Sequence, residues 1–278
     1  MTEDLPPLPK ELGKIEQRRD QFISSLIETF ERELNGVIAK AQAATLSELK
    51  EKLAEKDGAI DRTLANSAIL RNLDRLFLDE LNQAGYDRLL QSLIEEFPGQ
   101  LPFFQETIQA LSDAMKNPLP KMTWSARDLK LFSDQAFSTK DALEGIMESI
   151  AARAKQRILL SIGGLQFKDL ATSFAEYVHR ALPECVGLAE TSAATYYRVI
   201  ADRGYQVIEK DLPEMEIRYR YYGPYDLLIR PFCEHLMRVD KSYTRDQIDA
   251  MNNGQIPNVF ISCGGWRCRH AWLIALQP

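Results

Sequence analysis

No proline interrupts the sequence between Lys10 and Phe97, and apolar residues recur along this stretch with the period of an α-helix. The residues predicted to share one face of the first helix are Ile15, Phe22, Leu26, Phe30, Leu34, Val37 and Ala41. Gly58 is the predicted end of that helix. A helix that buries only one face needs a partner for it. The stretch therefore predicts a long, elbowed, mostly α-helical arm that contacts other protein chains.

Further helices are expected after the first one. They are predicted to begin at Asp61, to run from Asp87 to Glu96 and from Pro102 to Met115, and to run from Ser125 to Leu160 with Ser138 and Thr139 as a cap. The proline-rich stretch at 117–120 is the clearest internal break. We therefore expect residues 1–120 to form the helical arm and residues 121–162 to form a second helical segment or connector.

The pattern changes at the Gly163-Gly164 pair. Two helices are predicted there, over 167–182 and 187–204, followed by alternating, aromatic-rich segments typical of strands. The predicted strands are 205–209, 216–222 and 271–276, and the last of them is expected to return beside 218–222. We therefore expect residues 163–278 to form a compact α+β domain with a small antiparallel sheet, and the chain as a whole to be α+β.

Charge and hydropathy narrow the class of protein. The net charge is −6, and the whole excess lies before Asp211, because eight basic and eight acidic residues follow from there. An acidic chain without a basic stripe argues against a general nucleic-acid coat. No apolar run approaches the ~20 residues of a membrane span, and the first residues do not resemble a signal peptide. We expect a protein made in a cytosol or in a particle assembled there.

The cysteines and histidines near the C-terminus form two Cys-x-His pairs, Cys233/His235 and Cys268/His270. Residues two apart share a face only in an extended backbone. Two extended segments side by side would offer two sulfurs and two imidazoles, which is the ligand set of a structural zinc site. Cys263 could substitute for one ligand. Simple packing, or a disulfide between Cys233 and Cys268, would also account for these residues.

Charged residues flank the same segments. The predicted structural network consists of Glu190, Asp226, Arg230 and Arg269, with Arg267 and Glu234 nearby. With Arg218 and Arg220 these arginines could instead form a local anion-binding patch. An Asp226/His235 pair could serve general acid–base chemistry, but no nucleophile or oxyanion site lies at a convincing spacing. We therefore expect no enzymatic activity.

Three motifs, in this order, resemble the C-terminal domain of the phage Mu F-like minor head proteins. They are Leu188-Ala-Glu-Thr-Ser in a helix predicted to end at Gly204, Asp226-Leu-Leu-Ile-Arg-Pro with Cys233 and His235 downstream, and the closing Gly264-Gly-Trp-Arg-Cys-Arg-His. The resemblance covers about residues 160–278. This chain lacks the arginine that the family places before the Thr-Glu pair of the first motif.

The resemblance implies a structural minor head protein of a tailed bacteriophage, located in the virion and assembled in the bacterial cytoplasm. It further implies binding near the portal vertex, with portal and capsid proteins as partners, self-association in the particle, and a role in head assembly or DNA passage. A DNA-contacting module at the packaging channel, or a nuclease-like or transferase-like enzyme domain, is the alternative. Because the arm from Lys10 to about Met115 is expected to dock on other protein chains, deleting it should leave a soluble C-terminal domain that no longer co-purifies with heads.

Overall fold

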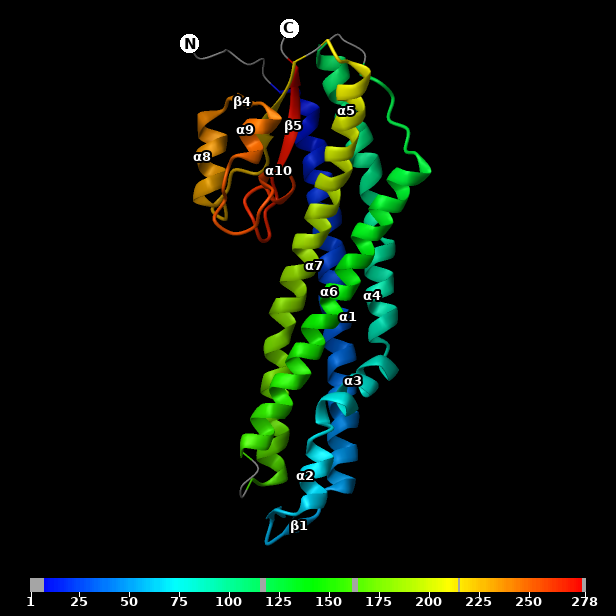
Figure 1. Cartoon of the computed structure of the whole chain (residues 1–278), viewed down its shortest axis with the longest axis vertical. Helices are drawn as coiled ribbons and strands as arrows, with labels where there is room; N and C mark the ends of the chain where they lie inside the picture. The colour runs from blue at the N-terminus through cyan, green and yellow to red at the C-terminus, as the bar shows by residue number, and fades with distance from the viewer. Residues whose placement is uncertain (1–7, 116–118, 162–164, 215, 277–278) are drawn as a thin grey trace. The chain divides into compact units, whose positions relative to one another are not determined.

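The computed structural model describes residues 8–115, 119–161, 165–214 and 216–276 (Figure 1). The chain is mostly helical, with a long N-terminal helix and a small antiparallel sheet in its C-terminal region, so the expected α+β class is confirmed. Pro118 and the Gly163-Gly164 pair, which marked two predicted boundaries, lie outside the described residues. None of the helices in these described ranges has an apolar stretch of the length that a membrane span requires.

The elements follow one another as a helical series and then a short α+β series. The helices are α1 (Lys10–Lys52), α2 (Leu64–Leu70), α3 (Leu73–Gln83), α4 (Tyr86–Glu95), the 3₁₀ helix η1 (Phe97–Gln100), α5 (Leu101–Met115), α6 (Ala126–Ser161), α7 (Phe167–Asp211), α8 (Pro231–Val239), α9 (Arg245–Asp249) and α10 (Val259–Ser262). The strands are β1 (Glu55–Lys56), β2 (Ala59–Ile60), β3 (Ile217–Tyr222), β4 (Ser242–Tyr243) and β5 (Ala271–Leu276).

The chain divides into two compact units that interleave along the sequence. Unit 1 contains residues 1–25, 96–137 and 190–278, and unit 2 contains residues 26–95 and 138–189. Each unit draws on all three of the ranges expected from the sequence, so the division into 1–120, 121–162 and 163–278 does not coincide with the units. The long helices α1, α6 and α7 each contribute residues to both.

Unit 2 is built from helices whose apolar faces pack together. The rings of Phe77 and Phe174 meet edge to face at 5.3 Å between centroids. The hydroxyl of Tyr86 donates to the carbonyl of Leu143 at 2.9 Å. An antiparallel turn of β1 and β2 follows α1, and Gly58 supplies the left-handed backbone it needs, with φ of 77°. Gly58 therefore lies in a hairpin after α1 has already ended at Lys52.

Unit 1 contains the three-stranded sheet, in the order β4-β3-β5 with both pairings antiparallel. The register of β3 on β5 runs from Ile217 opposite Leu276 to Tyr222 opposite Ala271. The predicted return of the last strand beside 218–222 is thus confirmed. The helices α8, α9 and α10 lie beside this sheet (Figure 1).

Aromatic rings fill the core of unit 1. The ring of Phe104 contacts Trp124, Tyr197 and Tyr205, with centroids 5.5–6.5 Å apart. A Cβ added at Gly204 would lie 2.2 Å from the Phe104 ring. Glycine at 204 therefore allows α7 to approach α5 closely, and it does not end the helix as the sequence pattern predicted.

Several predicted boundaries in the long helices are wrong. The two helices predicted over 167–182 and 187–204 are one helix, α7, which also contains the segment 205–209 predicted as a strand. Tyr205 and Ile208 are both buried. Residues three apart lie on one face of a helix, so tertiary packing overrides the β propensity of this segment. Similarly, Ser138 and Thr139 lie inside α6, whereas the predicted start near Ser125 is supported by the hydrogen bonds between Ser125 and Asp128.

Candidate metal centre

Two cysteine sulfurs and one imidazole meet inside unit 1. Cys233 comes from α8, while Cys268 and His270 come from the segment that leads into β5. The sulfurs lie 3.7 Å apart, and the sulfur of Cys268 lies 3.7 Å from Nδ1 of His270. All three side chains are buried, and their ligand atoms lie within 4.8 Å of one another. This group could hold a metal ion.

The loop before Cys268 is shaped around the sulfurs. Cys263, Gly265 and Arg267 adopt positive φ angles of 50°, 90° and 53°, which turn the chain tightly. The N–H of Gly264 donates to the sulfur of Cys268 at 3.2 Å. A Cβ at Gly264 would lie 2.2 Å from the sulfur of Cys233. Glycine is therefore required for the backbone to approach both sulfurs.

Residues 268–270, which carry Cys268 and His270, are called the ligand segment. Two buried arginines donate hydrogen bonds to its backbone carbonyls. Arg198 of α7 donates from Nε to the carbonyl of His270 at 2.9 Å, from another nitrogen to the carbonyl of Cys268, and from a third to that of Ile261 at 3.2 Å. Arg19 of α1 donates to the carbonyl of Arg269 at 3.0 Å. Three successive carbonyls therefore accept hydrogen bonds from guanidinium groups, and this fixes the direction of both ligand side chains.

The structure places His235 away from this cluster, so the predicted four-residue set is wrong at that position. Pro231 begins the helix α8, a common position for proline because its missing N–H is not needed there. Residues two apart diverge by about 200° on a helix. Cys233 consequently points into the core, while His235 is exposed. Only the Cys268/His270 pair has the extended backbone expected for a Cys-x-His pair sharing a face.

Cys263, the suggested substitute ligand, lies outside the group of three. It is fully buried, and its sulfur lies 3.9 Å from the carbonyl of Phe260. Burial raises the pKa of its thiol to about 12, which favours the neutral form.

The two clustered thiols differ in their affinity for a proton. The hydrogen bond from Cys233 lowers the pKa of Cys268, and the nearby His270 and Arg198 act in the same direction. The same hydrogen bond raises the pKa of Cys233, together with burial. Of the two thiols, Cys268 therefore loses its proton more readily. A thiolate is the form of cysteine that binds metals.

The predicted charged network surrounds the same loop. Glu190 pairs with Arg267 at 3.3 Å, and Asp226 pairs with Arg269 at 2.7 Å. Arg230 donates to the carbonyl of Gly264 at 2.8 Å. The hydrogen bond from Arg269 lowers the pKa of Asp226, which keeps that carboxyl ionised. The two further arginines considered for an anion-binding patch pair elsewhere, Arg218 with Glu216 and Arg220 with Asp240.

No family model, curated protein or solved structure matches this chain.

The geometry argues against a disulfide and against a reactive thiol at this cluster. A disulfide needs sulfurs about 2.05 Å apart, whereas Cys233 and Cys268 are free thiols at 3.7 Å. A nucleophilic Cys268 would need access, and only 4% of that residue is exposed.

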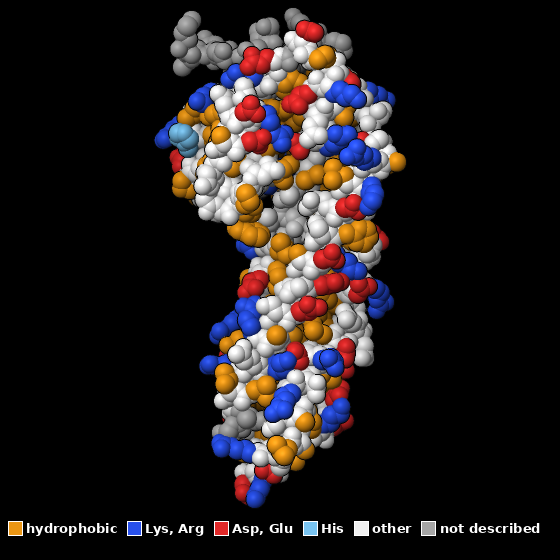
Figure 2. All heavy atoms as spheres, in the orientation of Figure 1, with side chains coloured by type: hydrophobic (Ala, Val, Ile, Leu, Met, Phe, Trp, Pro, Cys, Tyr) orange, Lys and Arg blue, Asp and Glu red, His pale blue; other side chains and the backbone are white. Residues whose placement is uncertain are grey.

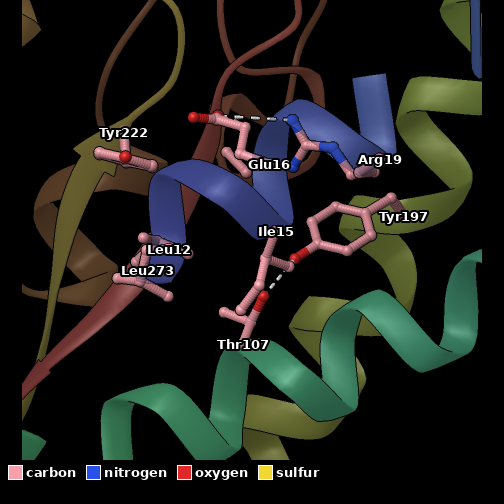
Figure 3. A pocket seen from close by; sticks show the side chains of 9 residues that line it. Leu12, Ile15, Glu16, Arg19, Thr107, Tyr197, Tyr222 and Leu273 are labelled. Atoms are coloured by element: carbon pink, nitrogen blue, oxygen red, sulfur yellow. Dashed lines mark hydrogen bonds and ion pairs between the residues drawn. The ribbon is translucent and has the colours of Figure 1, made fainter. Parts of the chain in front are cut away.

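A small hollow lies nearby in unit 1, lined by α1, α5, α7 and the sheet (Figure 3). Its volume is only about 10 Å³, roughly enough for one water molecule, and Glu16 and Arg19 are paired beside it. The guanidinium of Arg19 lies over the ring of Tyr197, 4.6 Å from its centroid. Burial raises the pKa of Glu16 to about 7. These contacts tie the start of α1 to the ligand segment through Arg19.

Sequence reasoning missed both Arg19 and Arg198. A signal for Arg19 was present, because it lies four residues after Ile15 on the apolar face of α1. Arginine in an amphipathic helix is ordinarily assigned to the surface. A basic residue inside an apolar stripe indicates a buried group that must find acceptors, and in this chain the acceptors include the carbonyls of Arg269 and His270.

Proposed function

We propose that this chain is a structural minor head protein of a tailed bacteriophage, bound near the portal vertex and assisting head assembly or DNA passage. The observation that carries the proposal is the convergence of the three motifs that resemble the Mu F-like family. Glu190 and Thr191 from the first motif contact Arg267 of the third, through an ion pair and through a hydrogen bond of 3.0 Å. Asp226 and Arg230 from the second contact Arg269 and Gly264 of the third.

This convergence favours a structural role for the motif residues. The carboxylates of Glu190 and Asp226 are engaged by arginines, and the lowered pKa of Asp226 makes it a weak general base. On the face shown in Figure 2, basic and acidic side chains are interspersed among the described residues without a continuous basic stripe. A general DNA-binding surface would concentrate basic side chains.

The proposal is tested on particles of the phage that encodes the chain. Quantitative mass spectrometry of purified proheads and virions should find a few copies per particle, and cryo-electron microscopy should place them at the portal vertex. Portal or capsid protein should co-purify with the full chain. Absence of the chain from both proheads and virions would refute the proposal, and density along the packaged DNA alone would favour the DNA-contacting alternative.

We further propose that the metal held by Cys233, Cys268 and His270 is a structural zinc ion. Sulfur and imidazole nitrogen are the ligands zinc prefers in proteins, and a buried site suits a structural role. Metal analysis of the full-length chain should find one zinc per chain, with strong depletion in Cys268→Ser. A metal-free protein that retains both free thiols would refute the zinc assignment.

A further inference from the structure

The hydroxyl of Tyr221 lies against the same cluster. Tyr221 belongs to β3, and its Oη lies 3.3 Å from the sulfur of Cys233 and 3.6 Å from that of Cys268. Its ring is stacked on the imidazole of His270, with 4° between the planes and 5.1 Å between centroids. The residue is 3% exposed. Four side chains therefore gather their polar atoms in one buried place.

The distances fit the corners of a tetrahedron. Around a zinc ion with bonds of about 2.3 Å to sulfur and 2.0–2.1 Å to nitrogen or oxygen, neighbouring ligand atoms lie about 3.5–3.8 Å apart. Three separations fall in this range: 3.7 Å between the sulfurs, 3.7 Å from the Cys268 sulfur to Nδ1 of His270, and 3.6 Å from the Cys268 sulfur to Oη. The fourth, 3.3 Å from the Cys233 sulfur to Oη, is slightly shorter. Oη of Tyr221 therefore lies at about a ligand-to-ligand distance from both sulfurs.

We propose that Oη of Tyr221 is the fourth ligand and closes a Cys₂-His-Tyr zinc site. The inference rests on the zinc site proposed above and adds its coordination. Its phenolic proton leaves to solvent on binding, as the thiol protons do. A site closed by four protein ligands is structural, whereas a catalytic zinc keeps one position for water or substrate.

The charge near the site and the small room for solvent favour Tyr221 over a water molecule as the fourth ligand. Arg198 donates to the carbonyls of Cys268 and His270, and no carboxylate among the described residues lies within ion-pair distance of it. Two thiolates balance the two charges of zinc, so an anionic fourth ligand compensates the buried guanidinium. Gly264 covers the sulfurs, and a Cβ at Gly223 would lie 2.6 Å from the imidazole of His270, so the backbone leaves little room for solvent.

The test uses the full-length chain, stripped of metal and reloaded with cobalt(II) or zinc(II). Tyr221→Phe removes Oη and keeps the ring stacked on His270. It should change the visible cobalt bands, which report ligand set and coordination number, and weaken zinc binding roughly tenfold or more. Tyr243→Phe, in the neighbouring strand β4 and also buried, is the matched control and should leave both unchanged.

The outcomes separate the two proposals. A wild-type chain that binds neither cobalt nor zinc refutes the zinc site itself. A wild-type chain that binds zinc, with Tyr221→Phe matching it in spectrum and affinity, leaves the zinc site standing and refutes Tyr221 as ligand. Should the variant fail to fold, zinc titration of the wild type decides, because coordination of Oη produces the ultraviolet difference spectrum of a phenolate and its absence refutes the inference.

Discussion

Arg19 of α1 and Arg198 of α7 hold the ligand segment of unit 1 in place by hydrogen bonds to backbone carbonyls. Arg198 is 3% exposed and satisfies three carbonyls, and Arg19 satisfies a fourth. A buried guanidinium is costly unless its donors are used, and a buried carbonyl is costly without a donor. The guanidinium groups and the carbonyls therefore satisfy each other's hydrogen-bonding capacity, and the loss of either leaves the other unsatisfied.

Replacing Arg198 should consequently destabilise unit 1. Arg198→Ala leaves three carbonyls without their donors, and we expect a loss of about 3–5 kcal/mol in the free energy of unfolding. Zinc occupancy should fall with it, because the carbonyls of Cys268 and His270 are no longer held. Arg238→Ala, at an exposed position of α8, is the control and should change stability by less than about 0.5 kcal/mol. Equal thermal midpoints for the two variants would contradict the role of Arg198.

Glu16 should make stability depend on pH. Burial raises its pKa from 4.5 to about 7 in the folded chain, so the folded state holds this proton more tightly than the unfolded state does. The stabilising contribution is complete below about pH 4.5 and is lost as the pH rises to about 7. The groups facing Glu16 are Arg19, Asp20 and Arg269.

Thermal unfolding of Glu16→Gln between about pH 5 and pH 8 tests this. The variant lacks the titration, so it should gain about 1–3 kcal/mol relative to the wild type over that range. Glu11→Gln, at an exposed position one turn earlier on α1, should show no such trend. A constant difference between Glu16→Gln and the wild type across the range would show that Glu16 does not titrate there.

The residues of the candidate site could be predicted only in part. Cys233, Cys268 and His270 could be predicted because thiols and imidazoles are characteristic metal ligands. The charged network could be predicted from opposite charges in neighbouring motifs. Tyr221 could not be predicted as a neighbour of the cluster, because its position depends on the register of β3 against β5. Aromatic residues in strands are ordinarily assigned to the core.

Helix α8 shows why the predicted four-residue ligand set is wrong at His235: the segment is a helix and not an extended strand. The Cys-x-His spacing predicts an extended segment at Cys233 and His235, yet Pro231 at the first helical position starts a helix there. The buried pattern of α8, with Cys233 and Leu236 inward, follows helical spacing. The side chains of the Cys268/His270 pair therefore lie close together, whereas those of the Cys233/His235 pair point in different directions.

His235→Ala should therefore leave zinc content unchanged, whereas His270→Ala should lower it. The side chain of His235 is exposed on the outer face of α8, and that of His270 lies among the sulfurs. Metal analysis of the two purified variants gives the comparison directly. Zinc depletion in both, to the same extent, would mean that α8 is not helical at His235.

Helix α7 is longer than its local sequence predicts. Its existence was predictable, but its length was not, because Gly204 and the alternating segment after it are ordinary signs of a helix end and a strand. The ring of Phe104 against Gly204 and the burial of Tyr205 explain the continuation. These contacts come from residues about 100 positions away, so no local pattern contains them.

At the scale of the whole molecule, unit 1 takes segments from both ends and the middle of the chain. The buried residues Leu12, Ile15 and Arg19 belong to it, together with Phe104 and the sheet. A fragment of residues 163–278 lacks the first four of these. The expectation that the C-terminal range would be soluble without the arm is therefore replaced by the opposite one.

We expect the fragment 163–278 to aggregate or remain unfolded when produced alone. Co-production with 1–162 should restore a soluble complex, because the missing segments of both units are then supplied in trans. Solubility and circular dichroism of the fragment, with and without its complement, give the test. A folded, monomeric fragment with bound zinc would show that the N-terminal segment is dispensable for unit 1.

The hydrogen bond from Arg19 to the carbonyl of Arg269 joins residues 250 positions apart. At translation rates of 5–20 residues per second, roughly 12–50 seconds separate the synthesis of its two ends. For that interval the first turns of α1 have left the ribosome while the strand that receives them does not yet exist. The apolar residues beside Arg19 are thus made long before the segment that packs against them, and chaperone binding in the producing cell should concentrate on them.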